Sequence, residues 1–226
     1  MPGLVSILVP CYNEASTITQ TVDQLNALRD NLDVEIIIID DGSTDGSFDK
    51  LIGLHGITVE RHQTNLGKGA AIATGAKRAM GDVIVVQDAD LEYDASVIPA
   101  LVEPILNGQW DVVYGSRFKG NIEGMTFSHL IGNKMLSYFT SFFFGAKVTD
   151  MMTGQKAFRA AVFRGLNLEA SGFEFELEVT VQVLQKGYSI HEIPIRYSKR
   201  KFGEAKIGWS DGFKTLVKMI EYRFGF

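Results

Sequence analysis

Short apolar runs separated by longer segments with helical spacing make up the first half of the chain. Runs of four or five mostly β-branched residues are typical of strands that are buried on both faces, as in a parallel sheet. They predict strands at 5–9, 35–39, 57–60, 83–86 and 111–114, with helices at 16–28, 47–54, 65–80 and 96–106. This alternation predicts an α/β fold, a doubly wound and mostly parallel sheet flanked by helices.

The second half has a different pattern. Residues 127–145 combine many large apolar side chains with few charges, which predicts a helix with more apolar surface than one face can bury. Two interpretations stay open: a core helix, or a helix that faces lipid or a hydrophobic acceptor. The remaining pattern predicts a short strand returning to the sheet at 156–159, a helix at 174–186, a strand at 189–197 and a terminal amphipathic helix at 209–226.

Composition narrows the class of protein. A chain of 226 residues forms a single domain with a sizeable core. The net charge of −5 argues against nucleic-acid binding. The single cysteine, Cys11, excludes an internal disulfide, and the histidines lack zinc spacing. Because the N-terminus runs directly into a strand and no apolar stretch reaches about 18 residues, we expect a cytoplasmic chain without signal peptide or membrane span.

Asp88 and Asp90 follow the most apolar of the short strands, at 83–86. Two residues apart on extended backbone, their carboxylates leave on the same side and repel one another unless a cation lies between them. Because Mg²⁺ binds one or two carboxylates together with phosphate oxygens, the pair predicts a metal site for a phosphorylated substrate. Taken alone, the motif is equally typical of a turn with a helix N-cap.

Polar side chains follow the other central strands as well. They are Tyr12 and Glu14 after the first, Asp40 and Asp41 after the second, and Arg117 after the fifth. Ligands of doubly wound sheets bind beyond the carboxyl ends of the strands. We therefore expect these side chains to converge with Asp88 and Asp90 on one site.

The segment 65–71 places Lys68 between two glycines at the start of a predicted helix, an arrangement that suits an anion. It is not a P-loop, because no glycine stands five residues before Lys68 and no hydroxyl residue follows it. Nor is it a dinucleotide fingerprint, since Ile72 occupies the position of the third glycine. A nicotinamide oxidoreductase is therefore disfavoured.

Four motifs, at 9–14, 40–45, 65–69 and 88–91, occur in an order and spacing that resemble family 2 glycosyltransferases of the GT-A fold. The segments 172–178, 192–195 and 200–206 resemble the dolichyl-phosphate mannose synthases and polyprenyl-phosphate glucosyltransferases. The resemblance covers nearly the whole chain. It implies one GT-A domain, with a half that binds the nucleotide sugar at 1–117 and a half that binds the acceptor at 118–226.

The resemblance also implies roles for individual residues. The donor would be bound by Pro10, Tyr12, Glu14, Asp41, Lys68, Gly69, Asp88, Ala89 and Asp90. Asp88 and Asp90 would hold Mg²⁺ or Mn²⁺ on the diphosphate. Arg117, Arg200 and Lys206 would collect the charge of the acceptor phosphate and of the leaving group.

We accordingly expect an inverting, metal-dependent transfer of a hexose from GDP-mannose or UDP-glucose to a polyprenyl or dolichyl phosphate. Such an acceptor is already an anion and needs no strong base. If the acceptor were instead a hydroxyl, Asp150 or a glutamate of 174–178 would have to accept its proton. A third possibility is a non-catalytic subunit that binds a sugar nucleotide.

Membrane contact is expected to be peripheral. The helix at 127–145 is too short to span a bilayer, and lysines and arginines accompany the apolar side of the terminal helix. The arginine often found near the start of the first of these helices in the family is absent, and His129 and Lys134 are the candidate substitutes. We expect docking on the cytoplasmic face of a membrane. The alternative is that both helices pack on the sheet, in a homo-oligomer or against a membrane-protein partner.

Overall fold

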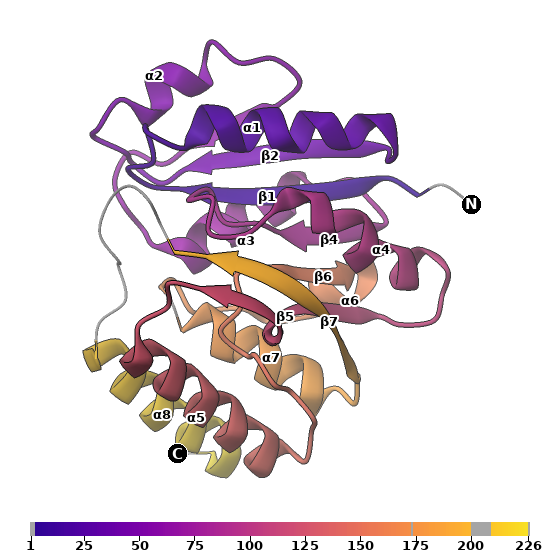
Figure 1. Ribbon diagram of the computed structural model, residues 1–226, viewed down its shortest axis with the longest axis vertical. Helices are drawn as coiled ribbons and strands as arrows, with labels where there is room; N and C mark the ends of the chain where they lie inside the picture. The colour runs from indigo at the N-terminus through magenta and orange to yellow at the C-terminus, as the bar shows by residue number, and fades with distance from the viewer. Residues whose placement is uncertain (1–2, 173, 200–208, 226) are drawn as a thin grey trace.

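The architecture is that of a computed structural model (Figure 1), which describes residues 3–172, 174–199 and 209–225, with side chains from 214 onward in the last segment. Arg200 and Lys206, two of the expected site residues, lie outside the described residues.

A seven-stranded sheet forms the centre of the molecule, in the order β3-β2-β1-β4-β6-β5-β7. The strands are β1 (Val5–Cys11), β2 (Val34–Asp40), β3 (Thr58–Arg61), β4 (Val83–Val86), β5 (Val112–Glu123), β6 (Lys156–Arg159) and β7 (Ile190–Ser198). β1 pairs in parallel with β2 and β4, β2 with β3, and β5 with β7. The expected α/β class with a mostly parallel sheet is confirmed.

The sheet departs from the expectation in one respect. β6 lies between β4 and β5 and is antiparallel to both, so that the strand from the second half of the chain separates two strands of the first half. β5 also continues to Glu123, well beyond the predicted end at 114, because its outer part pairs with β7 after a register shift. Arg117 therefore lies within β5 and not in a loop after it.

Helices cover both faces of the sheet (Figure 1). They are α1 (Ile18–Asn26), α2 (Ser47–Leu51), α3 (Lys68–Arg78), α4 (Ile98–Leu106), α5 (Phe127–Phe144), α6 (Ala160–Arg164), α7 (Phe175–Gln185) and α8 (Trp209–Phe224), with 3₁₀ turns at Ala27–Asp30 and Ala95–Val97. Alternate residues of β1 separate the two cores: Ile7 and Val9 pack with α1 and α4, and Leu8 packs with α3 and α7.

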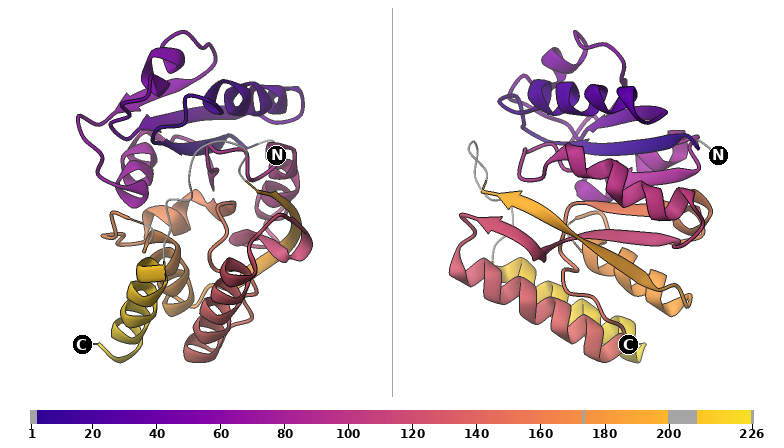
Figure 2. Two further views of the ribbon diagram at one scale, coloured as in Figure 1. Left: turned by 60° about the vertical axis from the view of Figure 1, so that its left-hand side comes forward. Right: turned by 45° about the vertical axis from the view of Figure 1, so that its right-hand side comes forward.

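α5, α7 and α8 form a further layer beside the sheet (Figure 2). α5 and α8 run in parallel, since Thr140 lies near Met219 and Phe143 near Phe224. Leu136 of α5 is buried in the small core of this layer. Within the described part of the chain, no helix is long and apolar enough to cross a membrane.

The outer side of this layer carries apolar side chains. We call it the α5–α8 face, and define it by Phe127, Ile131, Met135, Tyr138 and Phe142 of α5 and Val217, Ile220 and Phe224 of α8, which are 39–77% exposed. On α5 these positions are three or four residues apart, so they form one stripe along the helix. The interpretation as a core helix is therefore right for one side of α5 only, and the other side is exposed.

Candidate active site

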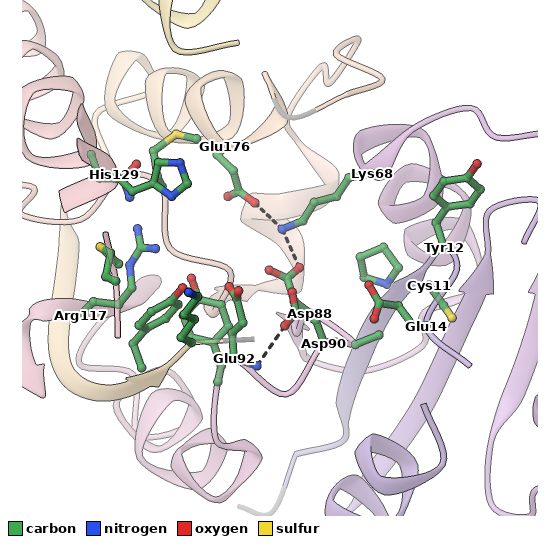
Figure 3. A pocket seen from close by; sticks show the side chains of 18 of the residues that line it. Cys11, Tyr12, Glu14, Lys68, Asp88, Asp90, Glu92, Arg117, His129 and Glu176 are labelled. Atoms are coloured by element: carbon green, nitrogen blue, oxygen red, sulfur yellow. Dashed lines mark hydrogen bonds and ion pairs between the residues drawn. The ribbon is translucent and has the colours of Figure 1, made fainter. Parts of the chain in front are cut away.

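A cavity of about 700 Å³ opens at the carboxyl ends of β1, β2 and β4 (Figure 3). Its wall includes eight of the nine residues expected at the donor site, namely Pro10, Tyr12, Glu14, Asp41, Lys68, Asp88, Ala89 and Asp90. Arg117 from β5 and His129 from α5 line its other side. The convergence expected from the strand ends is confirmed as geometry for Tyr12, Glu14, Asp41, Asp88, Asp90 and Arg117, which are far apart in sequence and share one hollow. It is wrong for Asp40, which is fully buried, contacts Arg61 of β3 at 3.2 Å and does not line the cavity.

Gly69, the ninth of these residues, does not line the cavity. It is a packing position: a Cβ on Gly69 would lie 1.9 Å from the carbonyl oxygen of Ala170. The backbone N–H of Ala70 also donates a hydrogen bond to the carbonyl oxygen of Ser171, at 3.2 Å. The glycine thus allows the segment before α7 to press against the start of α3, which places Lys68 at the cavity wall.

The end of β4 presents the two carboxylates expected to hold a metal. Asp90 is buried, and its Oδ1 accepts a hydrogen bond from the backbone N–H of Glu92 at 3.1 Å. Leu91, between Asp90 and Glu92, has a φ of 60°, a left-handed conformation that is rare in residues other than glycine. Such backbone strain is typical of functional sites, where the surrounding structure holds a turn that the chain alone disfavours.

Lys68 lies between two carboxylates (Figure 3). Its Nζ is 2.6 Å from Oδ1 of Asp88 and 2.7 Å from Oε1 of Glu176. Burial disfavours the charged amine, but the two carboxylates outweigh burial and raise the pKa of Lys68. Lys68 is therefore charged at neutral pH.

Glu176 is held on its other side by Lys156, a fully buried lysine of β6 whose Nζ also donates to the carbonyl oxygen of Thr153 at 2.5 Å. Burial raises the pKa of Glu176, yet the charges of Lys156 and Lys68 outweigh burial and lower it. Asp88, Lys68, Glu176 and Lys156 form a row in which acidic and basic side chains alternate. The sequence pattern did not single out Lys156, because its partner lies 20 residues away on another element.

Arg117 and Asp150 form a second buried ion pair. The Nε and Nη2 atoms of Arg117 each donate to a carboxylate oxygen of Asp150 at 2.7 Å, and the backbone N–H of Arg117 adds a third bond at 2.9 Å. Asp150 is fully buried and does not line the cavity. Its position corrects the expectation of a proton acceptor, because its carboxylate faces Arg117 and not the space where an acceptor would lie.

Asp41 lines the cavity and also orders the loop next to it. Its carboxylate accepts hydrogen bonds from the backbone N–H groups of Leu66 and Gly67, at 2.9 and 2.8 Å, and contacts Nδ1 of His62 at 2.7 Å. His62 was not expected in this role. The pattern before α3 contained no signal for it, since the contact depends on β3 lying beside β2.

Another part of the cavity wall is formed by residues of β5 and of the second half of the chain. They are Arg117, Gly124, Met125, Thr126, His129, Asn133, Met152, Tyr197 and Lys199. Most of these were not expected, because tyrosine, methionine and asparagine carry no motif of their own. Lys134, the other candidate substitute on α5, is not in the wall and lies near the ring of Phe118.

The residues of the cavity fit a divalent metal. Among the described residues, six carboxylates and three basic side chains line the wall, a surplus of negative charge that a diphosphate alone would meet with repulsion. No group of three or more metal-ligating side chains is found within the described residues. Two carboxylates with room for substrate oxygens match Mg²⁺ or Mn²⁺, which take part of their shell from phosphate.

Comparison with protein families gives one match, to the family described as "Glycosyl transferase family 2", over residues 6–166. The chain belongs to this family. The match spans β1 to the end of α6 and therefore includes the whole acidic side of the cavity except Glu176.

Two relatives extend the similarity beyond the family match. The chain is 30% identical over 225 residues to a dolichol-phosphate mannosyltransferase of Pyrococcus furiosus, with 94% of this chain and 61% of the relative covered. It is 28% identical over 247 residues to a UDP-N-acetylglucosamine–dolichyl-phosphate N-acetylglucosaminyltransferase of Methanococcus voltae, with 98% and 97% covered. This glycosyltransferase thus spans about three fifths of the first relative's length.

Among solved structures, the fold matches glucosyl-3-phosphoglycerate synthase from Mycobacterium tuberculosis in complex with Mn²⁺, uridine diphosphate and glucosyl-3-phosphoglycerate. The TM-score is 0.77 at 22% identity, with 99% of this chain and 80% of that chain covered. The likeness establishes the fold of the glycosyltransferase and nothing about its substrates.

Proposed function

We propose that the protein transfers a hexose, with inversion, from a nucleoside-diphosphate sugar such as GDP-mannose or UDP-glucose to a polyprenyl or dolichyl phosphate. The observation that carries the proposal is the cavity itself, which joins an acidic side at the end of β4 to a side that holds Arg117 and the first turns of α5. The two relatives whose names specify dolichyl-phosphate acceptors support it.

The donor would lie on the acidic side. Pro10, Tyr12, Glu14 and Asp41 would surround the base and ribose, and Asp88 and Asp90 would hold Mg²⁺ or Mn²⁺ on the diphosphate. The metal, when bound, would neutralise charge on the departing nucleoside diphosphate. In the same way, residues 1–117 would form most of the donor site, with Glu176 as a contribution from the rest of the chain.

Arg117 would receive the acceptor phosphate. Its guanidinium is held rigidly by Asp150, so no rearrangement is needed when an anion arrives. A phosphate attacks as an anion and requires no base, which agrees with a carboxylate of Asp150 that faces Arg117 and lies outside the wall. Arg200 and Lys206 would add positive charge at this site, as the family resemblance implies.

The α5–α8 face would bring the protein to the lipid. α5 begins in the cavity wall, at Thr126 and His129, and carries the exposed apolar side chains further along its length. A lipid held in a bilayer against this face could therefore present its head group at the opening of the cavity. Exposed Lys134, Lys214 and Lys218 stand on the same two helices and suit an anionic surface. We propose peripheral docking on the cytoplasmic face of a membrane, with residues 118–226 as the acceptor-binding half.

A donor panel tests the proposal. Purified protein, with Mn²⁺ or with EDTA, is incubated with GDP-mannose, UDP-glucose or UDP-N-acetylglucosamine and with either a short polyprenyl phosphate or a free sugar, and products are read by mass spectrometry. A glycosyl-phosphoryl-lipid product with one donor supports it. Transfer to a free sugar in place of the lipid phosphate, or activity that EDTA leaves unchanged, would show that the acceptor class or the metal is wrong.

A further inference from the structure

Lys68 occupies one carboxylate oxygen of Asp88, a residue that would hold the metal ion. The Oδ1 atom of Asp88 contacts Nζ of Lys68 at 2.6 Å, and Asp88 is one of the two carboxylates at the end of β4 (Figure 3). An ammonium and a divalent cation repel one another strongly at such distances in a partly buried site. Both cations therefore compete for Asp88.

The surroundings give Lys68 a second place to go. Glu176 contacts it at 2.7 Å and is itself fixed by buried Lys156, so Lys68 keeps one carboxylate if it leaves Asp88. Lysine is a compact charge on a flexible stem and can pivot about such an anchor. Lys68 is the first residue of α3 and lines the cavity, where a diphosphate would offer oxygens to the freed amine.

We infer that Lys68 is an exchangeable counter-ion of Asp88, which occupies this carboxylate until a metal–nucleotide complex displaces it onto the diphosphate. The inference rests on the metal site of the proposed function. Charge stays balanced in the exchange, because Asp88 gives up an ammonium for the metal while the ammonium gains a phosphate. A metal ion that binds without nucleotide gains only the two carboxylates, and the displaced Lys68 then has no phosphate to contact. Metal and nucleotide consequently bind as a unit.

Lys68→Met tests the exchange through metal binding and does not depend on turnover. Free Mn²⁺ is titrated by electron paramagnetic resonance, without nucleotide and with UDP or GDP. Because the variant leaves Asp88 available, we expect Mn²⁺ alone to bind more tightly than to the wild type, by about tenfold within the usual range of coupling between sites. The gain in Mn²⁺ affinity that the nucleotide confers should shrink by a similar factor. Lys68→Arg, which keeps the charge, should stay close to the wild type.

Lys199→Met is the matched control, because Lys199 lines the same cavity but makes no ion pair with Asp88 in the structure. It removes the same charge from the wall and should leave the affinity for Mn²⁺ alone within about twofold, since exposed charges are screened. If both methionine variants bind Mn²⁺ equally tightly, net charge explains the result and the exchange is wrong. Unchanged or weaker Mn²⁺ binding by Lys68→Met also overturns it.

A crystal structure of the wild type with Mn²⁺ and UDP or GDP covers the case in which Lys68→Met does not fold. Lys68 should have left Asp88 for a phosphate oxygen while keeping Glu176, and an intact contact with Asp88 contradicts the exchange. Failure of the proposed function looks different. Absence of transfer to the lipid phosphate together with the expected Mn²⁺ behaviour leaves the exchange in place, whereas a wild type that binds no Mn²⁺ with either nucleotide removes both.

Discussion

The two sides of the cavity are built on different principles. On the acidic side, charged groups are buried and paired before any ligand arrives, as in the row from Asp88 to Lys156 and in the bonds that fix Asp41. The α5–α8 face beyond the other side has few such pairs and exposes large apolar side chains to solvent. Under the proposed function, the first side would serve the chemistry and the second would serve contact with the lipid surface.

The largest expected effect comes from Asp90→Asn, which would break the acidic side at its centre. Loss of one carboxylate of the pair should lower kcat/KM by about 10²–10³-fold, the size seen when one electrostatic stabiliser of a transition state is removed. The measurement is steady-state transfer with Mn²⁺ at a fixed donor concentration. Thermal unfolding should change little, and a variant that transfers at the wild-type rate would exclude Asp90 as a metal ligand.

Asp150→Asn should affect stability as well as activity. It leaves the guanidinium of Arg117 buried without its counter-charge, and breaking a buried pair in this way typically costs about 3–5 kcal/mol of unfolding free energy. Urea unfolding measures the loss. Asp111→Asn is the control, because its ion pair with Arg159 is about 40% exposed on both sides and should contribute little. Equal losses of unfolding free energy in the two variants would show that burial of the Arg117 charge without Asp150 carries no extra cost.

Asp41→Ala should weaken nucleoside diphosphate binding by about 1–3 kcal/mol, because a buried acceptor of two backbone N–H groups is removed and the loop before α3 loses its order. Calorimetry with UDP and with GDP, without a sugar attached, gives the dissociation constants. His62→Ala is the comparison variant. It removes the contact between His62 and the carboxylate of Asp41 and leaves in place the hydrogen bonds from the backbone N–H groups of Leu66 and Gly67. If Asp41→Ala binds UDP and GDP with unchanged dissociation constants, the assignment of Asp41 to the donor site is wrong.

The smallest expected effect is on membrane binding through the α5–α8 face, and it tests the second region of the comparison. Met135→Gln on the α5–α8 face should weaken binding to anionic liposomes by about 1 kcal/mol, in proportion to the apolar side chain withdrawn, while nucleotide affinity stays the same. Met80→Gln is the matched control, an exposed methionine at the end of α3. Flotation that is lost equally in both, or in neither, would favour a protein partner or a second copy of the chain as the occupant of this face.

Much of the acidic side could be predicted because it follows from local pattern. A buried strand such as β4 must end somewhere, and polar residues directly after it in a parallel sheet share an edge with those of β1 and β2. Asp88, Asp90 and Glu14 needed only this rule and the family motifs. The helix α5 was likewise predicted within one residue of its observed end, since its apolar spacing extends over five turns.

The contacts that could not be predicted from the sequence join residues that are far apart along the chain. The pairing of Arg117 with Asp150 joins positions 33 residues apart, and nothing local distinguishes a lysine that will be buried, such as Lys156, from an exposed one. Gly69 was assigned to the donor site by the family resemblance alone. In the structure, its lack of a side chain serves the packing of Ala170.

The position of β6 has a consequence for how this enzyme family can diversify. Because a strand of the second half is inserted between β4 and β5, residues 1–117 and 118–226 share one hydrogen-bonded sheet and cannot be exchanged by recombination at residue 117. A chimera cut there would have to recreate three strand pairings at once, namely β4 with β6, β5 with β6, and the first part of β5 with β7. The segments outside the sheet, α5 above all, are under no such constraint. If the proposed function holds, new acceptors would be acquired by altering a helix, while the sheet that carries Lys156 and ends at Asp88 would be inherited whole.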